Sequence, residues 1–179
     1  MADTDDDHLL GKIAEGEILP KIIQSVGDKE FAVFVPALRA LGNILTTNDH
    51  SVVEKALFEG ALDKLTQILY STNSNLVKEC CWALSNICAG PPEHIEQLVA
   101  NPVFDRIIFL AASFNIDHKK EAMWVICNSI TGSNHHIKEK ILHFNNGQVL
   151  SVLINGMKLQ EARLLKNILE ALEELFKLD

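Results

Sequence analysis

Two tryptophans and two asparagines form the most regular chemical pattern in the chain. Trp82 precedes Asn86 by four residues, and Trp124 precedes Asn128 by the same interval. On an α-helix this interval places both side chains on one face, one turn apart. An asparagine carboxamide has both donors and an acceptor, so it can hold the N–H and the C=O of one residue of an extended peptide. The pattern therefore predicts a surface that recognises peptide backbone.

The indoles and the nearby acidic residues predict which side chains such a peptide carries. The stem of a Lys or Arg packs along an indole ring, and its charged head adds a cation–π attraction of about 0.5–2 kcal/mol. Glu79 and Glu121 each lie three residues before a tryptophan, on the neighbouring edge of the same helical face. We therefore expect an extended peptide rich in Lys and Arg.

A simpler interpretation makes each tryptophan a core residue and each asparagine a solvated surface residue. Asparagine is a mediocre helix former, however, and it recurs at the same position relative to tryptophan. This recurrence favours a binding role over the simpler interpretation.

The pattern belongs to an internal repeat of 42 or 43 residues. Residues 81–86 recur as residues 123–128 and, more weakly, as residues 38–43, where Arg39 and Asn43 take the Trp and Asn positions. A further step reaches Glu170. Repeats of this length predict an all-α solenoid of the armadillo or HEAT kind. We place about four repeats at residues 8–47, 51–89, 92–131 and 134–178, forming one domain over residues 8–179.

Each repeat is predicted to hold two short helices and a longer third helix that carries the pattern. A short, broken opening helix around Leu9 to Ile13 is expected first. The other expected helices cover residues 19–26, 31–45, 51–58, 62–70, 76–88, 93–100, 104–112 and 118–131, then a segment from Ile137 through Leu150 and a long helix at 160–178. Three helices per repeat are typical of the armadillo unit. That fold is known as a right-handed superhelix whose third helices line a concave groove.

The composition argues against several classes of protein. The 179 residues carry 24 Asp and Glu against 16 Lys and Arg, for a formal net charge of −8. A nucleic-acid surface needs clustered Lys and Arg, so the charge argues against nucleic acid and favours a basic partner. No apolar run is long enough to span a bilayer, so we expect no membrane partner.

The N-terminus and the cysteines predict the compartment. Residues 1–7 are acidic where a secretory signal would be basic and then apolar, and they are expected to be disordered. The four cysteines fit a reducing compartment. We therefore expect a cytosolic or nuclear protein.

No enzymatic, metal or cofactor chemistry is expected. Cys80, Cys81 and Cys88 share one helix without a second pair of ligands at zinc spacing, so they are predicted to be buried like Cys127. His135 and His136 begin a surface helix and lack a partner. There is no Gly-rich phosphate loop and no nucleophile elbow.

The repeated segments resemble importin α, the armadillo adaptor family that carries proteins with nuclear localisation signals. The resemblance runs through residues 36–44, 78–90 and 120–128, and its order of Arg/Asn, Trp/Asn, Trp/Asn is similar to repeats six to nine, which hold the minor signal-binding site. It implies that the chain binds nuclear localisation signals of cargo proteins during nuclear import and shuttles between cytoplasm and nucleus.

The resemblance also implies roles for particular residues. The peptide-binding residues would be Trp82, Asn86, Trp124, Asn128, Glu79, Glu121, Arg39, Asn43 and Thr46. Carbonyls near Leu45 and Thr46 would help to hold a lysine at the negative end of a helix. Thr47 replaces the expected glycine there. Arg163, Lys166 and Glu170 replace the Glu, Trp and Asn in the fourth repeat, where no signal-binding pair is expected.

Three further expectations concern partners. Importin β would bind only if the basic N-terminal arm were present, and nothing in the chain resembles that arm, the major-site repeats or the last repeat. The chain is thus expected to be a fragment or a truncated relative without transport activity of its own. The alternative is an armadillo scaffold for another extended partner. Self-association is expected through apolar ends, with the terminal helix around Leu164, Ile168, Leu172 and Leu175 lacking a cap.

Overall fold

In the computed structural model, which describes residue 12 and residues 16–178, several helices begin at short polar side chains that cap them. Asp49 accepts a hydrogen bond from the Ser51 amide at 3.0 Å, and Asn115 accepts one from the His118 amide at 3.1 Å. Each bond satisfies one of the N–H groups that a first helical turn leaves unpaired. The predicted opening helix and the predicted disorder of residues 1–7 lie outside the described residues.

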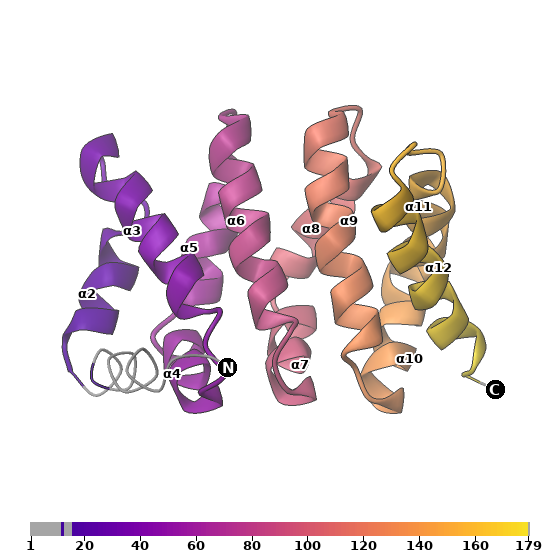
Figure 1. Ribbon diagram of the computed structural model, residues 1–179, viewed down its shortest axis with the longest axis horizontal. Coiled ribbons are helices and arrows are strands. Elements are labelled where there is room, and N and C mark those ends of the chain that lie inside the picture. The colour runs from indigo at the N-terminus through magenta and orange to yellow at the C-terminus, as the bar shows by residue number, and fades with distance from the viewer. Residues whose placement is uncertain (1–11, 13–15, 179) are drawn as a thin grey trace.

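The described part of the chain is entirely helical (Figure 1). The first repeat contains α2 (Ile18–Ser25) and α3 (Phe31–Ile44), and the second contains α4 (His50–Phe58), α5 (Ala61–Ile68) and α6 (Ser74–Ile87). The third contains α7 (Pro92–Ala100), α8 (Pro102–Ala112) and α9 (Ile116–Thr131). The fourth contains α10 (His135–His143), the 3-10 turn η1 (Phe144–Gly147), α11 (Gln148–Gly156) and α12 (Ala162–Phe176). The all-α solenoid is therefore confirmed. The segment predicted from Ile137 through Leu150 is divided into α10, η1 and α11, and the ends of the other predicted helices in the described residues lie within two residues of those observed.

The fourth repeat departs from the others between its first two helices. Asn145 and Asn146 have φ values of 44° and 57°, in the left-handed region, and Gly147 has φ 80°. Asparagine and glycine tolerate this region better than other residues do. The longer spacing of the last repeat is thus absorbed in a turn.

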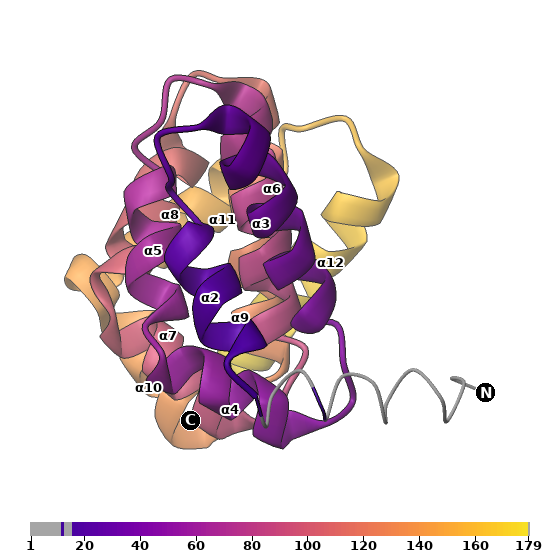
Figure 2. The ribbon, with the colours of Figure 1, turned by 90° about the vertical axis from the view of Figure 1, so that its left-hand side faces the viewer.

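The long third helices form one layer of the solenoid. α3, α6, α9 and α12 lie side by side, and each packs against the next. Seen along the solenoid, α3, α6 and α12 lie on one side and α5, α7, α8 and α10 on the other (Figure 2). A continuous apolar core fills the space between the layers, with fully buried Leu41, Leu84 and Ile126 from the third helices. The exposed face of α3, α6 and α9 is therefore where the repeated polar residues must lie.

The terminal helix α12 buries the residues that we expected at an exposed end. Leu164 and Ile168 are completely buried, and Leu172 and Leu175 are nearly so. The prediction that these residues form an exposed face was wrong, because they are the stripe that α12 packs against α9, α10 and α11. The apolar side chains that α12 does expose are Leu169 and Phe176.

No helix in the described residues is both long enough and apolar enough to cross a bilayer.

Candidate functional site

The predicted site residues lie on three neighbouring helices. Arg39 and Asn43 are on α3, Glu79, Trp82 and Asn86 are on α6, and Glu121, Trp124 and Asn128 are on α9. Thr46 follows the C-terminal end of α3. We call the surface formed by these nine residues the groove. The 42-residue period brings them together because each third helix packs against the next.

Trp82 lies against the backbone of the preceding repeat. A Cβ atom built on Gly42 would come within 2.2 Å of Cζ3 of Trp82, so only glycine allows the indole to take this position. Trp82 remains 36% exposed. Trp124 is more deeply placed and packs against the apolar core. The two indoles are therefore not equivalent.

A depression of about 450 Å³ lies between α6 and α9 and is lined by Lys78, Glu79, Trp82 and Glu121. Glu79 already has a partner, since Nε of Arg39 donates to its Oε1 at 2.8 Å. Glu121 has no ion pair among the described residues, and burial raises the pKa of its half-buried carboxyl group. The depression thus combines an accessible indole with a carboxylate that has no ion pair, near the Lys78 ammonium group.

Lys78 lines the depression between α6 and α9 and was missed by the sequence reasoning. Its ammonium group forms an ion pair with Asp117, with 3.0 Å between Nζ and Oδ2. Lys120, one repeat further on, pairs with Glu161 at 2.8 Å. The recurrence of Lys-Glu at residues 78–79 and 120–121 was the available signal, because both residues recur at the repeat interval.

Thr46 and Asn86 line a second, smaller depression of about 150 Å³ together with His50 and the chain after α3. Nδ2 of Asn86 donates to the Gly42 carbonyl at 3.1 Å, so part of its carboxamide is already used. The Thr46 hydroxyl donates to the Asn43 carbonyl at 2.7 Å. The hydroxyl of Thr47, where a glycine was expected, accepts a bond from the Asp49 amide at 3.0 Å.

Other predicted residues line neither depression. Arg39, Asn43, Trp124 and Asn128 lie beside them on the same helices. The Asn128 side chain makes no hydrogen bond within the described part of the chain, so both ends of its carboxamide remain available. On α12, Lys166 pairs with Glu170 at 3.2 Å.

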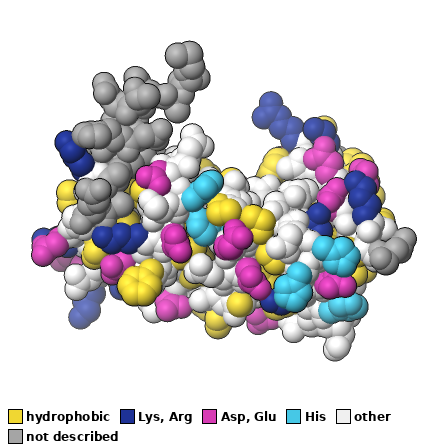
Figure 3. Space-filling view, turned by 90° about the horizontal axis from the view of Figure 1, so that it is seen from below, with side chains coloured by type: hydrophobic (Ala, Val, Ile, Leu, Met, Phe, Trp, Pro, Cys, Tyr) yellow, Lys and Arg dark blue, Asp and Glu magenta, His cyan; other side chains and the backbone are white. Residues whose placement is uncertain are grey.

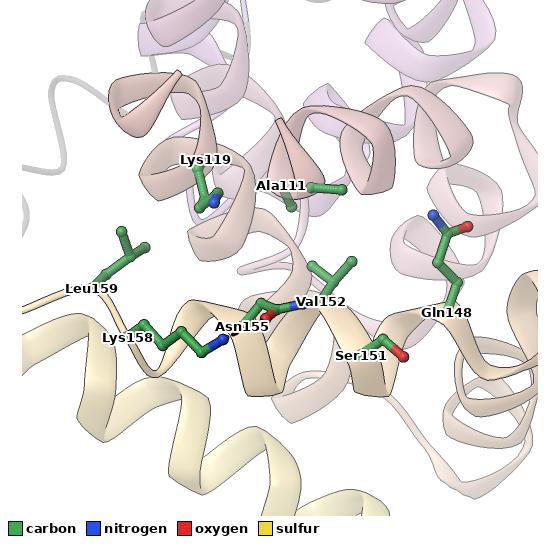
Figure 4. Close-up of a pocket in the computed structure, with 9 residues that line it drawn as sticks. Ala111, Lys119, Gln148, Ser151, Val152, Asn155, Lys158 and Leu159 are labelled. Atoms are coloured by element: carbon green, nitrogen blue, oxygen red, sulfur yellow. Dashed lines mark hydrogen bonds between the residues drawn. The ribbon is translucent and has the colours of Figure 1, made fainter. Parts of the chain in front are cut away.

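A third depression of about 410 Å³ lies away from the groove, between α8, α9 and α11. Gln148, Ser151, Asn155 and Lys158 lie along α11 and the turn after it, facing Ala111 and Lys119 (Figure 4). No predicted site residue lines it.

A buried histidine lies next to the smaller depression. His94 on α7 is 3% exposed, and its Nδ1 has no hydrogen-bond partner in the described structure. Its ring meets that of His50 edge to face, with centroids 6.0 Å apart. Burial, with the His50 charge as a smaller cause, lowers the pKa of His94.

The cysteines are packing residues, as predicted. All four are free and buried, and burial raises the pKa of Cys81, Cys88 and Cys127 to about 12. Such thiols stay protonated at neutral pH and are poor nucleophiles. Among the described residues, no group of three His, Cys, Asp or Glu side chains is arranged to hold a metal ion.

The lower edge of the solenoid carries no concentrated basic surface. Viewed onto the ends of α4, α7 and α10, acidic side chains are scattered among histidines, and Lys and Arg lie mainly toward the two ends (Figure 3). This face of the described structure therefore lacks the cationic patch that nucleic-acid binding needs.

Comparisons with known proteins agree with the observed fold. A sequence model of the Armadillo/beta-catenin-like repeat matches residues 59–89. The chain is 39% identical over 72 residues to importin subunit alpha-2 of Caenorhabditis elegans and 38% identical over 84 residues to importin subunit alpha-2 of Oryza sativa subsp. japonica. The chain has the armadillo-repeat fold, and over the matched segments it is similar to importin α. The matched segments cover 40% and 42% of this armadillo chain but only 13% and 16% of those relatives.

Solved structures of armadillo proteins match over nearly the whole chain. A designed armadillo repeat protein in complex with the peptide (KR)4 has a TM-score of 0.82 and 26% identity, over 94% of this chain and 69% of that one. A computationally designed armadillo repeat protein for modular peptide recognition has a TM-score of 0.80 and 24% identity, over 94% and 68%, which supports the fold alone.

Proposed function

We propose that this armadillo domain is an adaptor that binds Lys/Arg-rich nuclear localisation signals in extended conformation along the groove, as part of nuclear protein import. The observation that carries the proposal is the depression between α6 and α9, where the accessible Trp82 lies beside the unpaired carboxylate of Glu121. A Lys or Arg side chain would pack its stem on the indole and place its charge near Glu121.

The relatives and a structural neighbour support this proposal in two ways. The matched relatives are named importin subunit alpha, and the designed neighbour is described with a peptide of alternating Lys and Arg. Transfer of these properties implies an adaptor that works in both cytoplasm and nucleus. Nothing in this role requires catalysis or a cofactor.

The experiment is a titration of a fluorescent Lys/Arg-rich peptide against the wild type and the double variant Trp82→Ala/Trp124→Ala, at two salt concentrations. We expect saturable binding that weakens as salt rises, because the contacts are between exposed charges. The double variant should lose it.

The matched control for removing an aromatic side chain is Phe114→Ala. Phe114 is fully exposed in the turn between α8 and α9, outside the groove, so this variant should bind like the wild type. Equal affinity of the double variant and the wild type, with intact helical circular dichroism, would contradict the proposal.

A second candidate function is a scaffold for a different extended partner. It is favoured because two predicted peptide-binding side chains already have partners within the chain. Glu79 accepts a hydrogen bond from Arg39, and the Asn86 amide group donates one to the Gly42 carbonyl. An acidic peptide of equal length discriminates the two, because only the scaffold alternative predicts that it binds more tightly than the basic peptide.

A further inference from the structure

Two charged side chains along the third helices have no ion pair. They lie on successive repeats and have opposite charge. Four ion pairs neutralise most of the charged side chains on this face: Arg39–Glu79, Lys78–Asp117, Lys120–Glu161 and Lys166–Glu170, with nitrogen–oxygen distances of 2.8, 3.0, 2.8 and 3.2 Å. At the Glu and Trp positions of the described third helices, two charged residues have no ion pair: Glu121 on α9, and Arg163 on α12, which extends the groove by one repeat.

The register between neighbouring third helices places Glu121 beside Trp82, and the repeat extends this relation to Arg163 and Trp124. Arg39 on α3 reaches forward to Glu79 on α6, and Trp82 on α6 shares a depression with Glu121 on α9. In both cases the residue at the Trp position of one helix meets the residue at the Glu position of the next. The same step leads from Trp124 to Arg163, with the same sequence separation as from Trp82 to Glu121.

The position of α12 keeps Arg163 accessible. Arg163 lies in the first turn of this helix and is exposed. The ion pair between Lys120 and Glu161 joins α9 to the residue just before α12, close to the Arg163 side of the groove. The N-terminal end of α12 stands out on the same side of the solenoid as α3 and α6 (Figure 2).

We propose that the groove is bipolar: the step at Trp82 and Glu121 takes a Lys or Arg side chain, and the step at Trp124 and Arg163 takes an Asp or Glu side chain of the same extended peptide. This inference rests on the proposed function, because it assumes that a peptide follows the groove. A guanidinium is a strong donor to carboxylate oxygens, and the adjacent indole covers the stem of the acidic side chain.

The spacing of the two peptide residues follows from the repeat. Packed helices lie about 8–10 Å apart, and an extended chain rises about 3.3 Å per residue with side chains that alternate between its faces. Two side chains that face the same groove at successive steps must be an even number of residues apart. Two residues span about 6.6 Å, which is nearer to the helix spacing than the roughly 13 Å of four residues, so we expect a separation of two.

The test compares three fluorescent peptides of equal length by anisotropy. One is entirely Lys/Arg at the contact positions, and each of the other two carries Glu two residues from the central basic residue, on its N-terminal or its C-terminal side. Both placements are needed because the charges do not fix the direction of the peptide. We expect the wild type to bind one Glu-bearing peptide about two- to fivefold more tightly than the all-basic peptide, as expected for an exposed charge pair.

Charge reversal at one residue supplies the decisive comparison. The variant Arg163→Glu should reverse the preference and bind the all-basic peptide most tightly. Lys29→Glu makes the same change in net charge at an exposed position before α3, at the opposite end of the solenoid, and should keep the wild-type preference.

The peptide preferences distinguish a failure of the bipolar groove from a failure of the proposed function. If the wild type prefers the all-basic peptide, or if Arg163→Glu keeps the wild-type order, the bipolar groove is wrong while the proposed function stands. Failure of all three peptides to bind would contradict the proposed function and the inference together.

Discussion

At the scale of single residues, Glu121 should make the proposed peptide affinity depend on pH. Burial raises the pKa of this carboxyl group above its ordinary value of 4.5, so it takes up a proton at a higher pH than an exposed glutamate does. Affinity for a basic peptide should therefore fall as the pH drops through this raised pKa. The variant Glu121→Gln should bind more weakly at pH 7 and lose this titration.

The same substitution should raise the melting temperature at neutral pH. A raised carboxyl pKa means that the folded state disfavours the charged form, so removing the charge stabilises the fold. Glu59→Gln, at an exposed carboxylate after α4, is the control and should change neither affinity nor its pH dependence. A parallel loss of binding in both variants would show that net charge, rather than Glu121, controls the affinity.

Gly42 is a second residue whose role can be isolated. The variant Gly42→Ala puts a methyl group where the Trp82 ring lies, and such overpacking costs about 1–3 kcal/mol. In a Trp82→Ala background the clash is gone, and the same change should stabilise the helix by up to about 1 kcal/mol. Urea unfolding of the four proteins measures both effects. An equal cost in the two backgrounds would mean that the contact between the indole and the glycine backbone is unimportant.

At the scale of elements, the packing of α4 against α7 should make the stability of the fold sensitive to acid. Burial lowers the pKa of His94, so the unfolded chain binds a proton there at a pH where the folded chain does not. Stability is then unaffected above the unfolded pKa of about 6.5 and falls as the pH drops below it. Burial also lowers the pKa of His118, so this residue adds to the same dependence of stability on pH.

The variant His94→Leu should flatten part of this slope. His50, Glu54 and Glu93 are the charged or titratable groups that act on His94, so they are left unchanged. The exposed His136 serves as the control through His136→Gln, which should keep the wild-type slope. Thermal unfolding between pH 5 and pH 8 gives the comparison. Identical slopes in the wild type and in His94→Leu would contradict the assignment.

The helices were predictable from the sequence because their signals are local. Apolar periodicity and caps such as Asp49 and Asn115 act within a few residues, and the repeat supplied several copies of each signal. The contacts between repeats were not predictable, since Arg39 reaching Glu79 and Asn86 reaching the Gly42 carbonyl depend on how neighbouring helices cross. The peptide-binding roles of these residues stay predictions.

The terminal helix shows why one expectation failed. Its apolar stripe was taken for an exposed end, although α12 buries this stripe against α9 of the preceding repeat and against α10 and α11 of its own repeat. In α12 this stripe includes Leu164 and Ile168, which are completely buried. Sequence periodicity shows that one face is apolar, but it does not show which neighbour covers that face.

At the scale of the whole molecule, stability should spread through neighbouring repeats. Leu84 on α6 is completely buried, and Leu84→Ala should cost about 2–5 kcal/mol. In hydrogen exchange, protection should fall most in α3, α6 and α9 and least in α12, because a solenoid repeat contacts only its neighbours.

Leu169→Ala is the matched control for this experiment. Leu169 is 48% exposed on the outer side of α12, so its truncation should change stability by less than about 0.5 kcal/mol. A uniform loss of protection along all helices in Leu84→Ala would indicate that the solenoid unfolds as one unit instead.

The contact of Trp82 with Gly42, and of Arg39 with Glu79, means that each proposed binding position is formed partly by one repeat and partly by the next. A solenoid of such repeats therefore offers one proposed binding position fewer than its number of repeats, because each position needs two neighbouring repeats. Duplicating a repeat should thus lengthen the bound peptide by two residues. The peptide side-chain charge preferred at the new position should be set by the residue at the Glu position of the following repeat.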